Sequence, residues 1–172
     1  MKKTVSAVFA SLFILISYTN IYASGNNRLF IIERSKNANI VCYDLKTSAE
    51  GVIDSKNPVD AYWLLYAEKN GEREELSVFD KKAYGFKTDY NEQTKNYTLV
   101  LKAVENKNMA IVSVNGKYKA QLLINNTPAY LDKVYIQSKD GTFGIPTVYF
   151  YVLYGKTVSS DENIEEKIIL KK

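Results

Sequence analysis

The sequence contains no histidine, and this absence removes several classes of chemistry. Ser-His-Asp and Cys-His catalysis both need an imidazole base and are excluded. Zinc, copper and non-haem iron sites built on histidine ligands are excluded as well. We therefore expect neither a metal site nor a cofactor. A pair of carboxylates of the kind that glycosidases use stays possible, but no recognisable catalytic motif is present, so an enzyme is not favoured.

Cysteine is nearly absent too, because Cys42 is the only one in the chain. One thiol cannot form an internal disulfide. Cys42 lies in the apolar run 40–43, which predicts a small buried hydrophobic residue rather than a reactive thiolate. Stability must therefore come from an ordinary hydrophobic core, which a domain of about 150 residues can bury.

Arginine is scarce among the 23 basic residues, since only Arg28, Arg34 and Arg73 carry a guanidinium. Few groups can therefore clamp a carboxylate or phosphate in bidentate fashion. Lysines alternate with acidic residues along the chain instead of clustering, although the formal net charge is +4. Nucleic-acid binders normally carry clustered basic residues, so we expect no nucleic-acid partner.

The N-terminal segment has the order of a secretory signal peptide. Lys2 and Lys3 precede an apolar run at residues 5–16, and a more polar stretch leads to Ala23. The apolar run is about a dozen residues long, shorter than the ~20 that span a bilayer. We predict that residues 1–23 are cleaved after Ala23; an uncleaved N-terminal anchor is the alternative.

The exported product is then expected to be a single β-rich domain, residues 24–172, soluble in the periplasm or outside the cell. No stretch of this mature chain approaches the length of a membrane span.

Alternating apolar and polar residues recur along the rest of the chain at short spacing, which is typical of β-strands. The expected strands are residues 29–34, 40–44, 59–67, 97–104, 109–114, 117–124, 130–137, 147–154 and 167–170. The dipeptide Asn115-Gly116 between two of them is a strong hairpin signal. We predict an all-β, mainly antiparallel fold of about eight to ten strands, arranged as a β-sandwich, with a β-barrel as the alternative.

One helix is expected near residues 74–83. Leu76, Phe79 and Ala83 recur at helical spacing, with glutamates before them and lysines at the end. The competing interpretation is a strand that pairs back on residues 59–67 through a turn at Asn70-Gly71.

Tyrosine is abundant, with 14 in the chain, and tyrosine-rich surfaces bind glycans and peptides. Aromatic residues also suit strands, so many of these rings belong to the core. The charged segment after the first strand is either an exposed hairpin end or a polar ligand patch anchored by its arginine. The candidate ligand-binding residues are Glu33, Arg34, Asn39, Tyr62, Tyr66 and Tyr84.

Three blocks carry a family resemblance: LFIIERSKNANIVCY at residues 29–43, NPVDAYW at 57–63 and KAYGF at 82–86. They resemble a family of exported bacterial proteins catalogued only as a domain of unknown function. The resemblance implies a single exported domain without an established activity, and it supplies no catalytic residues.

The favoured function is that of a non-enzymatic binding or envelope-associated protein that recognises a glycan, a peptide or a protein partner. One alternative is a carboxylate-dependent hydrolase. The other is a carrier of a small apolar ligand in a barrel cavity.

Overall fold

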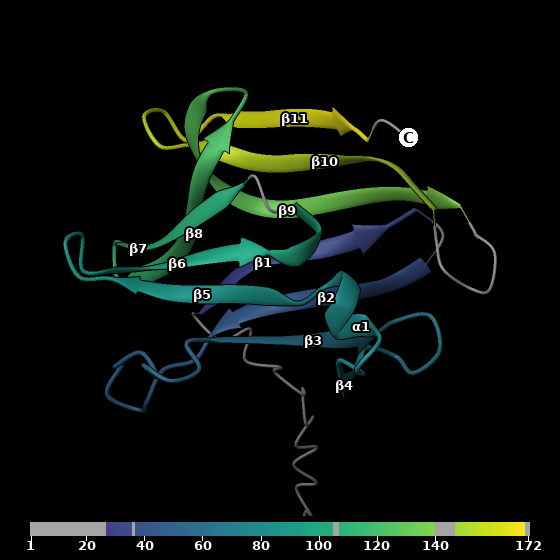
Figure 1. Ribbon diagram of the computed structural model, residues 1–172, viewed down its shortest axis with the longest axis horizontal. Helices are drawn as coiled ribbons and strands as arrows, with labels where there is room; N and C mark the ends of the chain where they lie inside the picture. Colours follow the sequence, from purple (N-terminus) through teal and green to yellow (C-terminus); the bar gives the residue numbers. More distant parts are fainter. Residues whose placement is uncertain (1–26, 36, 105–106, 140–146, 171–172) are drawn as a thin grey trace, which may run out of the picture.

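The computed structural model describes residues 27–170 except 36, 105–106 and 140–146. Eleven strands form a single sheet in the order β4-β3-β2-β1-β9-β8-β7-β6-β5, and β10 and β11 continue it from β9 (Figure 1). The strands are β1 (Arg28–Arg34), β2 (Asn37–Leu45), β3 (Val59–Leu65), β4 (Glu72–Glu75), β5 (Phe86–Asn91), β6 (Asn96–Leu101), β7 (Asn108–Val114), β8 (Lys117–Ile124), β9 (Thr127–Lys139), β10 (Thr147–Thr157) and β11 (Asn163–Ile169). A short helix α1 (Asp80–Ala83) and a 3-10 turn η1 (Lys102–Val104) complete the described chain.

Strand β9 joins the two halves of the sheet. Its first residues pair with β8, its later residues pair in parallel with β1, and β10 runs antiparallel along most of its length. All other pairs between described strands are antiparallel. Because one long strand serves both halves, the sheet can bend there and fold back on itself.

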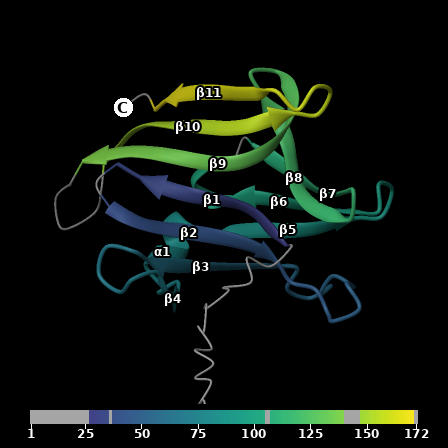
Figure 2. The same ribbon diagram turned by 180° about the vertical axis from the view of Figure 1, so that it is seen from behind.

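The bend places β5 and β6 over β1, β2 and β3, as the front and rear views both show (Figures 1 and 2). Aromatic contacts confirm that these layers touch: the ring centroids of Tyr43 and Phe86 are 5.9 Å apart. The prediction of an all-β, mainly antiparallel fold is confirmed. The two layers belong to one open sheet, so the alternative of a closed barrel is wrong.

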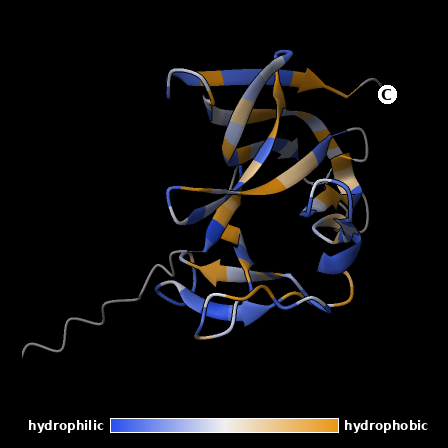
Figure 3. Cartoon of the chain, turned by 90° about the vertical axis from the view of Figure 1, so that its left-hand side faces the viewer, coloured by the Kyte–Doolittle hydropathy of each residue, from blue (hydrophilic) through white to orange (hydrophobic). Residues whose placement is uncertain are grey.

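The core lies between the layers and follows the period-2 alternation of the strands. Phe30 and Ile32 of β1 face Tyr43 and Val41 of β2 in register, and all four are buried. The side view in Figure 3, which colours each residue by its hydropathy, shows hydrophobic residues mainly in the strands and hydrophilic residues in most turns. Cys42 is fully buried, as predicted, and burial raises the pKa of its thiol to about 11.

The prediction of a helix near residues 74–83 is mostly wrong, because only Asp80–Ala83 of this segment is helical. Residues 72–75 form β4 and pair with β3 through the Asn70-Gly71 turn, whose φ angles are +54° and +83°. The competing strand interpretation is therefore correct for this part. Leu76 is buried whereas Phe79 is 79% exposed, so their helical spacing does not correspond to one buried face.

Other boundaries differ at strand ends. The strand predicted at residues 97–104 stops at Leu101 and is followed by η1. Strand β5 was not predicted, although Phe86, Thr88 and Tyr90 alternate there with charged or polar residues. No helix in the described part of the chain has the length and apolar character to cross a membrane. The predicted signal peptide, residues 1–23, lies outside the described residues.

Candidate ligand-binding site

Arg34 ends β1 on the side that faces the second layer. Its guanidinium carbon lies 4.7 Å from the ring centroid of Trp63 and 6.0 Å from that of Tyr84, which is cation–π geometry. Its Nε is buried and has no hydrogen-bond partner among the described residues. A buried donor without an acceptor is costly. Because this Nε is closed to solvent, an anionic ligand can reach only the other nitrogens of the guanidinium.

Two buried rings form the platform beneath Arg34. Trp63 of β3 is in register with Val41, which is itself in register with Ile32, so these residues share the inner face. Tyr84 follows α1 and meets Trp63 edge to face, with centroids 5.1 Å apart. Burial raises the pKa of the Tyr84 phenol, against the opposing influence of Arg34. The phenol is therefore neutral at physiological pH.

An apolar cleft opens beside this platform, between the two layers. Its walls include Ile32, Tyr84 and Ile136, and its volume is about 60 Å³. Ile32 lies two residues before Arg34 on β1, and Ile136 is the register partner of Arg34 on β9. Arg34 itself does not line the recess; Tyr84, whose ring centroid is 6.0 Å from the guanidinium carbon, belongs to both the platform and the wall of the recess. An apolar cavity of about 150 Å³ holds a benzene molecule, so this recess suits a smaller aliphatic group.

Four of the six predicted ligand residues lie elsewhere. Glu33 points to the opposite face from Arg34 and pairs with Lys133, with Nζ 3.0 Å from Oε2. Asn39 is buried, and its Oδ1 accepts a hydrogen bond of 2.8 Å from the backbone N–H of Ala67. The Asn39 side chain therefore holds the turn after β3.

Tyr66, the third of them, is 53% exposed, and its ring covers Gly71. An added Cβ at Gly71 would come within 2.6 Å of the Tyr66 ring. The close contact therefore gives Tyr66 a packing role at the β3–β4 turn.

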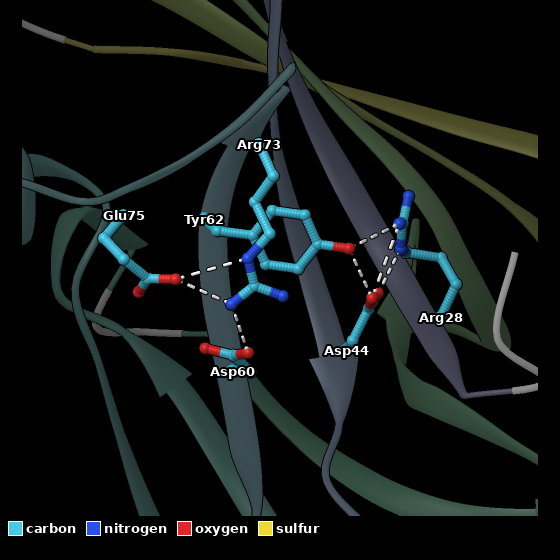
Figure 4. Close-up of polar contacts among 6 residues, drawn as sticks. All are labelled: Arg28, Asp44, Asp60, Tyr62, Arg73 and Glu75. Atoms are coloured by element: carbon cyan, nitrogen blue, oxygen red, sulfur yellow. Dashed lines mark hydrogen bonds and ion pairs between the residues drawn. The ribbon is translucent and has the colours of Figure 1, made fainter. Parts of the chain in front are cut away.

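Tyr62 belongs to a polar network on the outer face, which Figure 4 shows. Its hydroxyl donates to Asp44 Oδ2 at 2.7 Å and accepts from Arg28 Nη2 at 3.2 Å. Arg28 also pairs with Asp44 through Nε. Burial, followed by the carboxylate of Asp44, raises the pKa of Tyr62 to about 12. The phenol is not activated as a nucleophile or base.

Arg73 completes this network from the other side of the ring. Its guanidinium carbon lies 3.9 Å from the Tyr62 centroid, and its Nη2 reaches Asp60 at 2.8 Å and Glu75 at 2.7 Å (Figure 4). The guanidinium groups and carboxylates thus bind one another. We interpret the network as a structural cover over Cys42, which is in register with Tyr62.

Carboxylates at a second place bear on the hydrolase alternative. Asp132 and Glu165 line a shallow depression together with Tyr154. Desolvation raises the pKa of Asp132, while Lys119 and Lys156 oppose the shift. Carboxylate catalysis requires a raised pKa on one acid and a second acid across the cleft.

Within the described residues, no group of three or more histidine, cysteine or acidic side chains is arranged to hold a metal ion.

Comparison with known proteins places the chain in a family. The model described as Domain of unknown function (DUF4833) matches residues 30–167. The chain belongs to this family. The match confirms the predicted resemblance to a domain of unknown function, whereas export and bacterial origin stay predictions. No curated protein and no solved structure matches the chain.

In this DUF4833 domain, the structure thus brings two of the six predicted residues together, Arg34 and Tyr84. Trp63 was missed, although it is the only tryptophan in the chain. Its neighbour Tyr62 was selected instead, because both faces of this strand are apolar in sequence. Only the register of β3 shows that Trp63 faces Arg34 while Tyr62 faces outward.

Proposed function

We propose that this chain is an exported, non-enzymatic binding protein that recognises a peptide segment of a partner. Arg34 holds a carboxylate of the peptide, and the adjacent cleft receives a small aliphatic side chain. One observation carries the proposal: the Arg34 guanidinium is stacked on Trp63 and lies beside Tyr84, which lines an apolar recess.

The contrast among the three arginines supports this role. Arg28 and Arg73 each form ion pairs with acidic side chains. None of the ion pairs found between described residues includes Arg34, which rests on aromatic rings. A planar guanidinium held in this way is pre-organised for a bidentate carboxylate.

The size and lining of the cleft favour a peptide over the other ligands considered. A cavity for a drug-sized or lipid-like ligand measures about 300–1,000 Å³, whereas this recess measures about 60 Å³. A glycan needs several polar partners, yet the recess is lined by side chains such as Ile32, Val134 and Leu170. A branched aliphatic side chain beside a carboxylate fits both parts of the site.

Export is the second part of the proposal and rests on the N-terminal sequence. The order of Lys2, Lys3, the apolar run at residues 5–16 and Ala23 supports a cleavable signal peptide. Mass spectrometry of the secreted chain would test it, because cleavage predicts a new N-terminus at Ser24. An intact N-terminus on the exported protein would contradict cleavage.

The binding site is tested with short acetylated peptides that end in leucine or valine, each with a free carboxylate or an amide at its C-terminus. Nitrogen-15 NMR follows the indole N–H of Trp63, whose signal is unique because the chain has one tryptophan. We expect the free-acid peptides to shift this signal and the amides to bind more weakly.

The substitution Arg34→Gln should weaken free-acid binding by about 10- to 100-fold, the usual range for losing a hydrogen bond to a charged group. The matched control is Arg73→Gln, which removes a guanidinium on the outer face and should leave peptide binding unchanged. Equal binding of acids and amides, or unaltered binding by the Arg34 variant, would refute the site. Shifts of the Trp63 signal by oligosaccharides alone would favour a glycan instead.

A further inference from the structure

A second feature lies outside this cleft: an apolar knuckle formed by Val78 and Phe79 at the start of α1. These side chains are 76% and 79% exposed, the highest values among the large hydrophobic residues of the described chain. Exposed apolar side chains are common when scattered singly. Two adjacent ones of this exposure, on a fixed turn, need an explanation.

The knuckle is rigid because both of its ends and its turn are fixed. Leu76 before it and Tyr84 after it are buried. The Ser77 hydroxyl accepts a hydrogen bond of 3.1 Å from the Asp80 backbone N–H, and Asp80 Oδ2 accepts one of 3.0 Å from the Ser77 backbone N–H. This reciprocal capping holds the turn. Val78 and Phe79 are therefore presented to solvent without the entropy of a loose loop.

Lysines surround the knuckle. Lys82 lies with its Nζ 5.3 Å from the Phe79 ring centroid. Lys102 donates from Nζ to the backbone oxygen of Lys81 at 3.4 Å, which places these two lysines side by side. None of the ion pairs found between described residues includes any of the three. The knuckle therefore combines an apolar tip with an unneutralised basic collar.

A shallow groove continues the basic collar onto the outer surface of β5 and β6. Lys87 and Lys102 line it together with Val100 and Leu101, and its volume is about 300 Å³. Of the acidic residues nearby, Asp80 caps the turn at Ser77, while Asp89 lies two residues after Lys87 on β5 and is exposed on the same face. The groove and collar thus offer several ammonium groups to a phosphate-bearing surface.

We propose that the Val78–Phe79 knuckle docks this protein on an anionic phospholipid surface. The two apolar side chains enter the boundary between headgroups and acyl chains, while Lys81, Lys82 and Lys102 contact lipid phosphates. Aromatic and aliphatic tips flanked by lysine are suited to this boundary, which is apolar on one side and negatively charged on the other. The inference does not depend on the peptide site.

The experiment uses the full chain and vesicles of phosphatidylcholine with or without phosphatidylglycerol. The substitution Phe79→Trp adds an indole at the tip. Because Trp63 also emits, the signal of the tip is the difference between the emission of this variant and that of the unmodified chain, and a contact made by the N-terminal segment does not produce it. We expect the emission of the added indole to shift to shorter wavelength, and to be quenched by brominated acyl chains, only when phosphatidylglycerol is present. High salt should weaken the effect, because exposed charges are screened.

Co-sedimentation then compares variants that carry the same N-terminal segment. The pair V78S/F79S should lower partitioning to anionic vesicles at least about tenfold, and K81Q/K82Q should do so by roughly tenfold or more. The matched control is Val52→Ser, which changes another exposed valine in the β2–β3 connection, away from α1 (Figure 1). That variant should partition like the unmodified chain.

Two results would overturn the proposal. One is a Phe79→Trp emission that stays unchanged on anionic vesicles. The other is equal sedimentation of V78S/F79S and the unmodified chain. Circular dichroism of each variant is the control for fold, because an unfolded chain can also insert its apolar residues into anionic vesicles. An unchanged emission would instead make an acidic protein surface the better candidate for this knuckle.

Discussion

Gly155 of β10 lies where two strands approach so closely that no side chain fits. An added Cβ would lie 2.2 Å from the backbone oxygen of Tyr130 on β9 and 2.9 Å from Cδ1 of Ile124. The register shifts at this point, between Tyr154 and Gly155, which is the mark of a β-bulge. Gly155→Ala therefore forces backbone against backbone.

The cost follows from this geometry. The strands must separate by about 0.8 Å to reach even a tight contact of 3.0 Å, and overpacking of this kind costs about 1–3 kcal/mol. Alanine regains about 0.5–1 kcal/mol over glycine within a strand. Because the obstacle is a backbone atom, we take the upper end and expect a net loss of about 2 kcal/mol. For a domain of this size, that lowers the Tm by about 4–8 °C.

Urea unfolding followed by the fluorescence of Trp63 measures this loss. The matched control is Gly116→Ala, in the hairpin between β7 and β8, where an added Cβ meets nothing within 4 Å but φ is +75°. Its cost comes from backbone strain alone, about 1–2 kcal/mol. If Gly155→Ala unfolds at the same urea concentration as the unmodified chain, the close approach of β9 and β10 is refuted.

Two further predictions concern the core and the pH dependence of stability. Tyr43→Phe should lower the free energy of unfolding by about 1–2 kcal/mol. The buried Tyr43 hydroxyl donates at 2.5 Å to the backbone carbonyl of Tyr84, and in the variant this carbonyl oxygen loses its donor. An unchanged urea midpoint would contradict this prediction. Glu166 accepts from Lys107 Nζ at 2.7 Å and from the Asn125 N–H at 3.0 Å, and these contacts outweigh desolvation and lower its pKa below the ordinary 4.5. Since the unfolded state binds this proton more readily, the stabilisation is present above pH 4.5 and is lost as the pH falls through the folded pKa. The Glu166→Gln variant should therefore be less stable than the unmodified chain at pH 7. In urea titrations repeated towards pH 3, the difference in free energy of unfolding between the two chains should become smaller. A difference that stays constant with pH would argue against the ionised contact.

Much of the fold could be predicted because its signals are local. The alternation in residues 117–124 and the Asn115-Gly116 pair specify β8 and its hairpin within a few residues of chain. Where two local signals competed, at residues 72–83, pairing with β3 decided the outcome. Strand pairing of Glu72–Glu75 satisfies the backbone there, and helical spacing alone could not reveal that Phe79 has nothing to pack against.

The candidate site was only half predictable, because its residues come from segments that are distant in the chain. Arg34 could be selected because a guanidinium after an apolar strand is unusual in this chain. Its surroundings could not be predicted, since Trp63 and Tyr84 reach it from β3 and from the residue after α1. Adjacent residues on a strand face opposite sides, so a one-residue difference in register would have exchanged Trp63 for Tyr62.

By itself, the sequence determined the β class, the buried thiol and the exclusion of histidine chemistry. Composition and period-2 alternation are properties of short stretches and need no partner strand. Only the tertiary structure decided that the sheet folds back at β9, that Arg34 rests on Trp63 beside an apolar recess, and that Tyr62 belongs to an outward ion-pair network. These features depend on which strands pair and in what register, and long-range hydrophobic burial selects that pairing.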